Sequence, residues 1–155
     1  METKFSKILV PIDGSKFSMD AAEYGIVLSN KYNAELSILH VLHPGEIGEG
    51  IHYFGTEVPE QTKKLIEERK DEVYEWFDSI KNLSKKYAKE KEIQIKTEII
   101  ESHSVVSSIT EFSEKNNVDL IVMGTKGRTG IKRLLLGSVA SKVMTYSHCP
   151  VLIVR

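Results

Sequence analysis

The stretch KILVPIDGS, residues 7–15, decides the fold of this chain. Its apolar first part is typical of a buried strand, and Asp13-Gly14 is a turn pair that ends the strand. Either Ser15 or Ser18 can cap the helix that follows. A buried strand that passes directly into a helix is the first step of an alternating α/β pattern.

The alternation continues to the end of the chain. Further strands are predicted at residues 36–42, 93–99, 120–123 and 151–154, with helices that end near residue 32, begin near residue 61, and span about 104–116 and 138–147. Connections are short except for residues 43–59, whose four glycines and two prolines predict a flexible loop. We therefore expect a single α/β domain over residues 1–155, with an open parallel sheet covered by helices on both faces.

Two helices show which of their faces packs on the sheet. In the first helix the apolar positions are Ala21, Ala22, Ile26, Val27 and Leu28. In the long helix they recur at steps of three and four, at Ile66, Val73, Trp76, Phe77, Ile80, Leu83 and Tyr87. This spacing indicates that Trp76 is a core residue rather than a cofactor contact. Residues 93–99 alternate between apolar and polar, which predicts a half-buried strand at the edge of the sheet.

Composition argues against several kinds of partner. The 21 Lys and Arg nearly balance the 22 Asp and Glu, so the net charge gives no basis for binding nucleic acid or an anionic membrane. No apolar run approaches the roughly 20 residues that cross a bilayer, and the amino terminus leads into a strand without a signal-peptide pattern. Cys149 is the single cysteine, so no intramolecular disulfide forms and a cytoplasmic location is expected.

A glycine-rich segment marks the candidate ligand site. It follows the apolar strand 120–123 and reads GTKGRTG at residues 124–130. Gly124 and Gly127 allow a tight turn and a close approach of the backbone to a ligand. After nine further residues, Gly-Ser-Val at residues 137–139 opens a helix, whose free N–H groups and positive dipole end suit a phosphate.

The spacing of these glycines is more informative than any one of them. A single glycine is as well explained by a turn or a helix cap. With glycine at about 7% of residues, the joint pattern Gly-x2-Gly-x9-Gly-Ser is expected by chance in about 1% or fewer of chains of this size. In an open parallel sheet, ligands bind outside the carboxyl ends of the strands, and the motif begins at one such end. The motif therefore predicts a site for a sugar and a polyphosphate.

The glycine motif, together with ILVPIDGS at residues 8–15, His40-Val41 and CPVLIV at residues 149–154, resembles the universal stress protein family over nearly the whole chain. The motif is similar to that of the family's ATP-binding branch. The resemblance implies a Rossmann-like, adenine nucleotide alpha hydrolase-like fold, a five-stranded sheet in the order 3-2-1-4-5. It also implies a nucleotide-dependent stress-response or regulatory switch rather than an enzyme.

The same resemblance implies how the adenosine part of ATP, or of another adenine nucleotide, is held. Pro11, Ile12 and Asp13 line the pocket, with Ser15 beside them. The Asp13 carboxylate accepts from the ribose or helps to hold a divalent ion, Mg²⁺ or Mn²⁺. The backbone of Val41 reads the edge of the adenine.

For the base, the ribose and the phosphates, the resemblance points to the glycine motif. Its expected contacts are Met123, Gly124, Thr125, Lys126, Gly127, Arg128, Thr129, Gly137, Ser138 and Val139. Among the basic residues, Arg128 is the expected phosphate contact, and the direction of Lys126 stays open. The histidines show no metal-ligand spacing, so structural or exposed positions are expected for them.

Two enzymatic alternatives stay open. The chain can be a slow ATPase, or a nucleotidyl-transferring relative, that uses Asp13, a divalent ion and Arg128. It can also be a phosphoacceptor receiver domain, but that class needs an acidic cluster at two strand ends, and Asp13 is alone. The sequence contains neither GxxxxGK[ST] nor GxGxxG, and no Ser–His–Asp signature. These absences favour a binding module.

Two further hypotheses concern the loop after the second strand and the last strand. Tyr53 and Phe54 lie in the loop 44–59, which is either a lid over a bound base or an idle surface loop. The strand Val151–Val154 is short and apolar, and the family order places it at a sheet edge, where it invites pairing with another chain. In the family that pairing makes a two-fold dimer, so a homodimer through this strand is expected.

Overall fold

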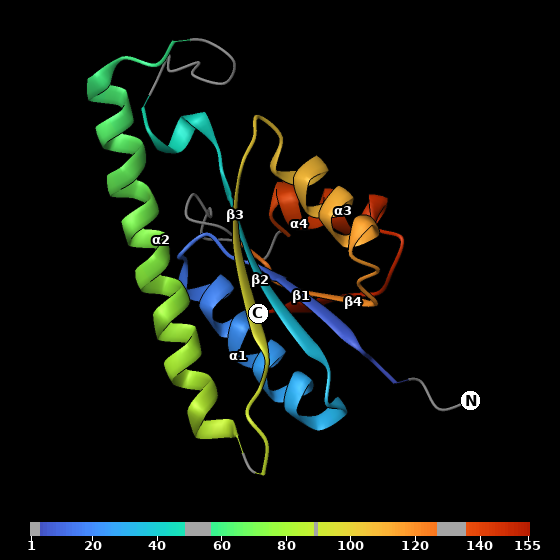
Figure 1. Cartoon of the computed structure of the whole chain (residues 1–155). Helices are drawn as coiled ribbons and strands as arrows, with labels where there is room; N and C mark the ends of the chain where they lie inside the picture. The colour runs from blue at the N-terminus through green and yellow to red at the C-terminus, as the bar shows by residue number, and fades with distance from the viewer. Residues whose placement is uncertain (1–3, 49–56, 89, 127–135) are drawn as a thin grey trace.

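The computed structural model describes residues 4–48, 57–88, 90–126 and 136–155 of the chain. Within these residues, five parallel strands form one sheet in the order β3-β2-β1-β4-β5 (Figure 1). The strands are β1 (Lys7–Pro11), β2 (Glu35–Leu42), β3 (Ile95–Glu101), β4 (Leu120–Gly124) and β5 (Val151–Val154). The predicted fold class and the order 3-2-1-4-5 are confirmed.

Helices cover both faces of the sheet, as Figure 1 shows. They are α1 (Lys16–Tyr32), α2 (Glu60–Tyr87), α3 (Val105–Lys115) and α4 (Ser138–Tyr146). Successive residues of a strand point to opposite faces, so Ile8 and Val10 pack with α1 and α2, whereas Leu9 packs with α3 and α4. Two separate apolar cores therefore sandwich the sheet.

Short polar side chains set where the helices begin. The hydroxyl of Ser15 accepts a hydrogen bond from the backbone N–H of Ser18, which makes Ser15 the N-cap of α1. Ser18 lies inside the helix, and its hydroxyl donates to the carbonyl of Ser15. At the far end Asn33 takes a left-handed conformation with φ of 55° and ends α1. Ser104 caps α3 in the same way as Ser15, as predicted.

Most of the predicted packing faces are confirmed, with one exception. Val27 was predicted to belong to the apolar stripe of α1, but 43% of it is exposed. The buried positions of α1 include Ala22, Ile26 and Ser29, which fall at helical spacing on one face. Val27 follows Ile26 directly, and successive helical residues point about 100° apart. Its side chain therefore lies beside the buried face rather than in it.

The other expectations about packing agree with the structure. Trp76 is half-buried and packs against the core beneath α1 and α2. The strand β3 lies at the sheet edge and is half-buried, as its alternation predicted. It begins at Ile95 rather than Ile93 because its pairing with β2 starts opposite Leu36. Among the described residues, no helix is long and apolar enough to cross a bilayer.

The long connection after β2 begins with a 3₁₀ turn, η1 (Pro44–Glu46). The ring of His43 accepts a hydrogen bond from Gly45 N–H at 3.1 Å, and the carboxylate of Glu46 accepts from His43 N–H at 3.4 Å. Tyr53 and Phe54, the residues of the lid hypothesis, lie outside the described residues.

Candidate functional site

The strand order fixes where a ligand site is expected. The strand β1 pairs with β2 on one side and with β4 on the other, so the winding of the sheet reverses between β1 and β4. In doubly wound sheets, ligands bind at the carboxyl edge of this switch point. The predicted residues at the ends of β1 and β4 meet there because the two strands are direct neighbours.

The turn between β1 and α1 is held by its own polar groups. Ile12 is buried and its N–H donates to Leu39 O at 2.8 Å, so the chain still follows the sheet at this point. Asp13 N–H donates to the hydroxyl of Ser18 at 3.2 Å, and the Oδ1 atom of Asp13 accepts from Ser15 N–H at 3.0 Å. The carboxylate of Asp13 is therefore fixed at the start of α1, at the carboxyl edge of β1.

Gly14 is required by two independent features of this turn. Its φ is +77°, a conformation that favours glycine. A Cβ atom at this position would also lie 2.3 Å from the ring of Trp76 on α2. The indole therefore supports the turn directly from the α2 side.

The end of β4 packs closely against the first turn of α1. A Cβ atom on Gly124 would lie 2.7 Å from the backbone carbon of Phe17. Glycine at this position therefore allows the glycine segment to begin right beside the Asp13 turn. Met123, one residue earlier, is buried in the core between the sheet and the helices α3 and α4.

Thr125 connects both ends of the glycine motif to the sheet. Its N–H donates to Val154 O at 2.9 Å, and its carbonyl accepts from Gly137 N–H at 2.6 Å. Gly137 has no room for a side chain here, because a Cβ atom would lie 2.9 Å from Thr125 O. The structure therefore brings together the two parts of the motif that are separated in the sequence. Lys126 is half-buried, and Gly127, Arg128 and Thr129 lie outside the described residues.

The amino end of α4 begins directly after Gly137 and has no side-chain cap. Gly137 is its N-cap and has no side chain to bond the first turn. Ser138 is exposed and Val139 is half-buried against the core. The first N–H groups of a helix are free to bind an anion when no side chain caps them. This helix start therefore suits a phosphate.

The remaining predicted residues flank this edge. Pro11 is the last residue of β1 and is buried. Val41 lies near the carboxyl end of β2, where it is buried against the α3 and α4 face and paired in register with Ile100 of β3. No group of three or more His, Cys, Asp or Glu side chains in the described ranges is arranged to hold a metal ion.

His40 takes the structural position that the sequence favoured, but its contacts were not predicted. It is buried in β2, with 1% of its surface exposed, and its Nδ1 atom lies 2.8 Å from Ile12 O. Its Nε2 atom lies 3.3 Å from Oε2 of Glu46 in η1. The available signal was a single ionisable residue inside an otherwise apolar strand, but the contact with Ile12 spans 28 residues of sequence.

Glu46 is the carboxylate of this cluster. Arg69 of α2 donates to its Oε2 atom from Nε at 3.0 Å and from Nη2 at 2.8 Å. Burial raises the pKa of Glu46, but the nearby His40 ring and the hydrogen bonds and charge of Arg69 outweigh burial and leave the pKa below its ordinary value. The carboxylate therefore stays ionised beside the His40 ring.

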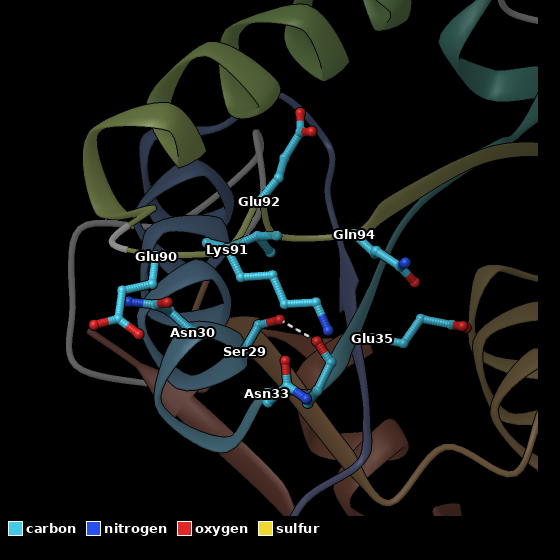
Figure 2. Close-up of a pocket in the computed structure, with 10 residues that line it drawn as sticks. Ser29, Asn30, Asn33, Glu35, Glu90, Lys91, Glu92 and Gln94 are labelled. Carbon is cyan, nitrogen blue, oxygen red and sulfur yellow. Dashed lines mark hydrogen bonds between the residues drawn. The ribbon is translucent and has the colours of Figure 1, made fainter.

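A separate pocket of about 340 Å³ lies at the opposite end of the sheet. Figure 2 shows that its polar lining comes from the end of α1, the start of β2 and the segment before β3. Ser29 donates to Ala34 O at the wall of this pocket, and Asn30 donates to Tyr87 O at 2.8 Å. Because it opens at the amino ends of the strands, this pocket is distinct from the site at the switch point.

Fold and site together define a doubly wound α/β protein with a glycine-rich motif at the carboxyl edge of its sheet. The chain belongs to the universal stress protein family, whose sequence profile matches residues 4–155. It is 39% identical to universal stress protein YxiE of Bacillus subtilis, over 97% of this chain and 99% of that protein. It is 36% identical to universal stress protein MJ0531 of Methanocaldococcus jannaschii, over 99% and 84% of the two chains.

Solved structures agree with the fold. The structure of MJ0577 from M. jannaschii superposes with a TM-score of 0.79 at 28% identity and covers 98% of this chain and 96% of its own. Two more distant structures are complexes. A universal stress protein with cAMP superposes with a TM-score of 0.69 at 22% identity and covers 99% of this chain and 98% of its own. The universal stress protein from Archaeoglobus fulgidus with dAMP superposes with a TM-score of 0.65 at 15% identity and covers 99% of this chain and 100% of its own. These two show that the fold is shared.

Proposed function

We propose that this protein binds an adenine nucleotide, with ATP as the leading candidate, at the carboxyl edge of β1 and β4. The observation that carries the proposal is the hydrogen bond from Gly137 N–H to Thr125 O. It holds the uncapped start of α4 against the end of β4, and Gly124 in turn contacts α1 next to the Asp13 turn. A carboxylate for a ribose or a metal ion and a helix end for phosphates thus share one edge.

The roles that we propose for the individual residues are those that the family resemblance implies. Pro11, Ile12 and Asp13 hold the ribose side, with Mg²⁺ or Mn²⁺ between Asp13 and the phosphates. The backbone of Val41 reads the adenine. Ser138 and the first turn of α4 hold the phosphates, and Arg128 and Thr129 complete that contact. The complexes of related proteins with cAMP and dAMP support an adenine nucleotide as the ligand class.

We infer a regulatory binding module of the cytoplasm rather than an enzyme. Oδ1 of Asp13 is already used by the turn, because it accepts from Ser15 N–H. A carboxylate held in this way suits the fixed binding of a ligand. Slow hydrolysis with a divalent ion is the alternative, and neither nucleic acid nor a membrane surface is part of the proposal.

We also propose that the protein forms a homodimer through β5. This strand is at the edge of the sheet and pairs only with β4 among the described strands. Its residue Leu152 exposes 37% of its surface. An apolar edge strand with free backbone groups favours pairing with a second copy.

The first experiment is mass spectrometry of ligand released from freshly purified protein. Calorimetric titration follows with ATP, ADP, AMP and cAMP, each with and without Mg²⁺. We expect a co-purified adenine nucleotide, or a dissociation constant in the micromolar range, which corresponds to a binding free energy of about −8 kcal/mol. The proposal would be rejected if no nucleotide were released and none of the four compounds bound. Rapid release of phosphate from ATP would replace the binding module by an enzyme.

A matched pair of variants tests the position of the site. Gly137→Val places a side chain against Thr125 O, where even a Cβ atom comes within 2.9 Å. Ser141→Val adds the same residue to an exposed position one turn further along α4. We expect Gly137→Val to weaken nucleotide binding by about tenfold or more, which is about 1.4 kcal/mol, while Ser141→Val binds like the parent protein. Equal binding by both variants would place the ligand elsewhere.

A further inference from the structure

The peptide unit between Ile12 and Asp13 is held at both of its polar ends. Its carbonyl, from Ile12, faces His40 Nδ1 at 2.8 Å, and its N–H, from Asp13, donates to the hydroxyl of Ser18 at 3.2 Å. A peptide unit is planar and rigid, so two anchors on opposite sides fix its rotation. The direction in which Asp13 leaves β1 is therefore set by His40 on one side and by Ser18 on the other.

The chemistry of this contact fixes the protonation of one ring nitrogen. A carbonyl oxygen only accepts hydrogen bonds, so His40 Nδ1 carries a hydrogen and donates it to Ile12 O. The second nitrogen, Nε2, lies 3.3 Å from a carboxylate oxygen of Glu46, within ion-pair distance. It is buried and makes no aligned hydrogen bond within the described residues. Its contact with Glu46 is therefore a close approach within ion-pair distance rather than an aligned hydrogen bond.

A second set of residues holds the His40 ring in place. Trp76 meets the ring edge-on, with 5.5 Å between the ring centroids. The guanidinium of Arg69 lies over the Trp76 ring, 5.1 Å from its centroid, and donates to Glu46 from two nitrogens. Trp76 also packs against Gly14. Two members of the cluster, His40 and Trp76, thus contact the residues on either side of Asp13, Ile12 and Gly14.

We propose that His40 is a positioning residue of the nucleotide site: it holds the Ile12 carbonyl and so orients Asp13, while Glu46 and Arg69 keep its ring in place. The inference rests on the proposed function, because Asp13 is the residue that faces the nucleotide. It also gives η1 a role, since Glu46 connects the start of the 43–59 connection to the Asp13 turn.

The two ring nitrogens of His40 can be tested separately. His40→Asn keeps an N–H donor near the position of Nδ1, and His40→Gln keeps one near the position of Nε2. Both variants bury a neutral amide in the same place. We expect His40→Asn to bind ATP within about threefold of the parent protein and His40→Gln to bind about tenfold more weakly. Equal losses in both variants, or no loss in His40→Gln, would overturn the proposal.

The support from Glu46 has its own matched control. Arg69 binds two carboxylates, Glu46 and Glu72, but only Glu46 reaches His40. We expect Glu46→Gln to weaken ATP binding by several fold and Glu72→Gln to leave it unchanged. Comparable effects of the two substitutions would show that Arg69 acts without His40, which contradicts the proposal.

A second readout separates this proposal from the proposed function. Backbone amide chemical shifts of Asp13 and Gly14, measured by NMR without any nucleotide, report the conformation of the turn directly. We expect His40→Gln to move these shifts clearly more than His40→Asn does. If the parent protein bound no adenine nucleotide, the proposed function would fail, but this comparison would still confirm or refute the hold of His40 on the turn.

Discussion

Gly14 shows how strictly single residues of the site are determined. Its left-handed backbone and its contact with the Trp76 ring are separate constraints. The first is a conformational cost for any other residue, and the second is a steric clash. A substitution here therefore disturbs both the Asp13 turn and the packing of α2.

We expect Gly14→Ala to lower the free energy of unfolding by about 1–3 kcal/mol or more. Urea unfolding followed by circular dichroism measures the change. Gly45→Ala is the matched control, because the nearest atom to its new Cβ is Nδ1 of the His43 side chain at 3.1 Å and its φ is not in the left-handed region. It should change the same quantity by about 0.5 kcal/mol or less. Similar losses in both variants would show that the Trp76 contact relaxes easily.

The ionised Glu46 makes a second prediction at this scale. Its pKa in the folded protein is lowered from 4.5. A lowered pKa stabilises the folded state above the unfolded pKa, and this contribution is lost as the pH falls through the folded value. The parent protein should therefore lose stability below about pH 4.5 more steeply than Glu46→Gln. Parallel stability curves for the two proteins between about pH 5 and pH 3 would contradict this assignment.

At the scale of helices and strands, Ser15 and Ser104 make a comparison between two caps of the same kind. Each accepts a hydrogen bond from the backbone three residues further on. Each also donates its own N–H to the side chain two residues earlier, Ser15 to Asp13 and Ser104 to Ser102, and of these two acceptors Asp13 is the one at the proposed site. Only the first cap is therefore part of the proposed site.

We expect Ser15→Ala and Ser104→Ala to destabilise the protein by similar amounts, about 1 kcal/mol each, because each removes one helix cap. Thermal unfolding measures this loss. Only Ser15→Ala should also weaken ATP binding, which titration calorimetry measures. A loss of affinity in Ser104→Ala of the same size would mean that the effect comes from general stability rather than from the site.

The elements themselves could be predicted from the sequence because their signals are local. Ser15 and Ser104 stand at helix starts, where their side chains bond neighbouring backbone groups, and Asn33 ends α1 through its left-handed backbone. The prediction for Val27 was wrong because apolar residues next to a helical stripe need not be buried. The sheet order came from the family resemblance, since pairing between β1 and β4 is not visible in local pattern.

The candidate site was predictable only in part, because only some of its signals are local in the sequence. The glycine motif and Asp13 are contiguous signals at strand ends. The cluster around His40 draws on Ile12, Glu46, Arg69 and Trp76, which come from separate elements. No periodicity or short motif connects these positions, so the cluster became visible only once the chain was folded.

At the scale of the whole molecule, the exposed edge of β5 leads to a test of assembly. Ile153 packs against the core on the α3 and α4 side, whereas Leu152 is partly exposed. A charge at Leu152 therefore disturbs a dimer contact with less damage to the fold than a charge at Ile153. This choice of residue follows from the structure.

We expect Leu152→Lys to convert a dimer into a monomer in analytical ultracentrifugation, because a charge on a paired apolar edge must be desolvated. Leu65→Lys places the same charge on an exposed apolar residue of α2, 44% exposed, and should leave the sedimentation unchanged. A parent protein that sediments as a monomer, or a Leu152→Lys variant that remains dimeric, would count against β5 as the interface.

The strand order also has a consequence for how the protein is made. The strand β1 is synthesised before the other four strands of this sheet, yet it lies at the centre of the sheet and is completed only by β4. Asp119, next to β4, accepts hydrogen bonds from the N–H groups of Ser6 and Lys7, more than 110 residues earlier. Until residue 124 has been synthesised, one edge of β1 lacks its partner. Nascent chains that stop before β4 should therefore remain open to proteases and chaperones, and the edge of the proposed nucleotide site should form late in synthesis.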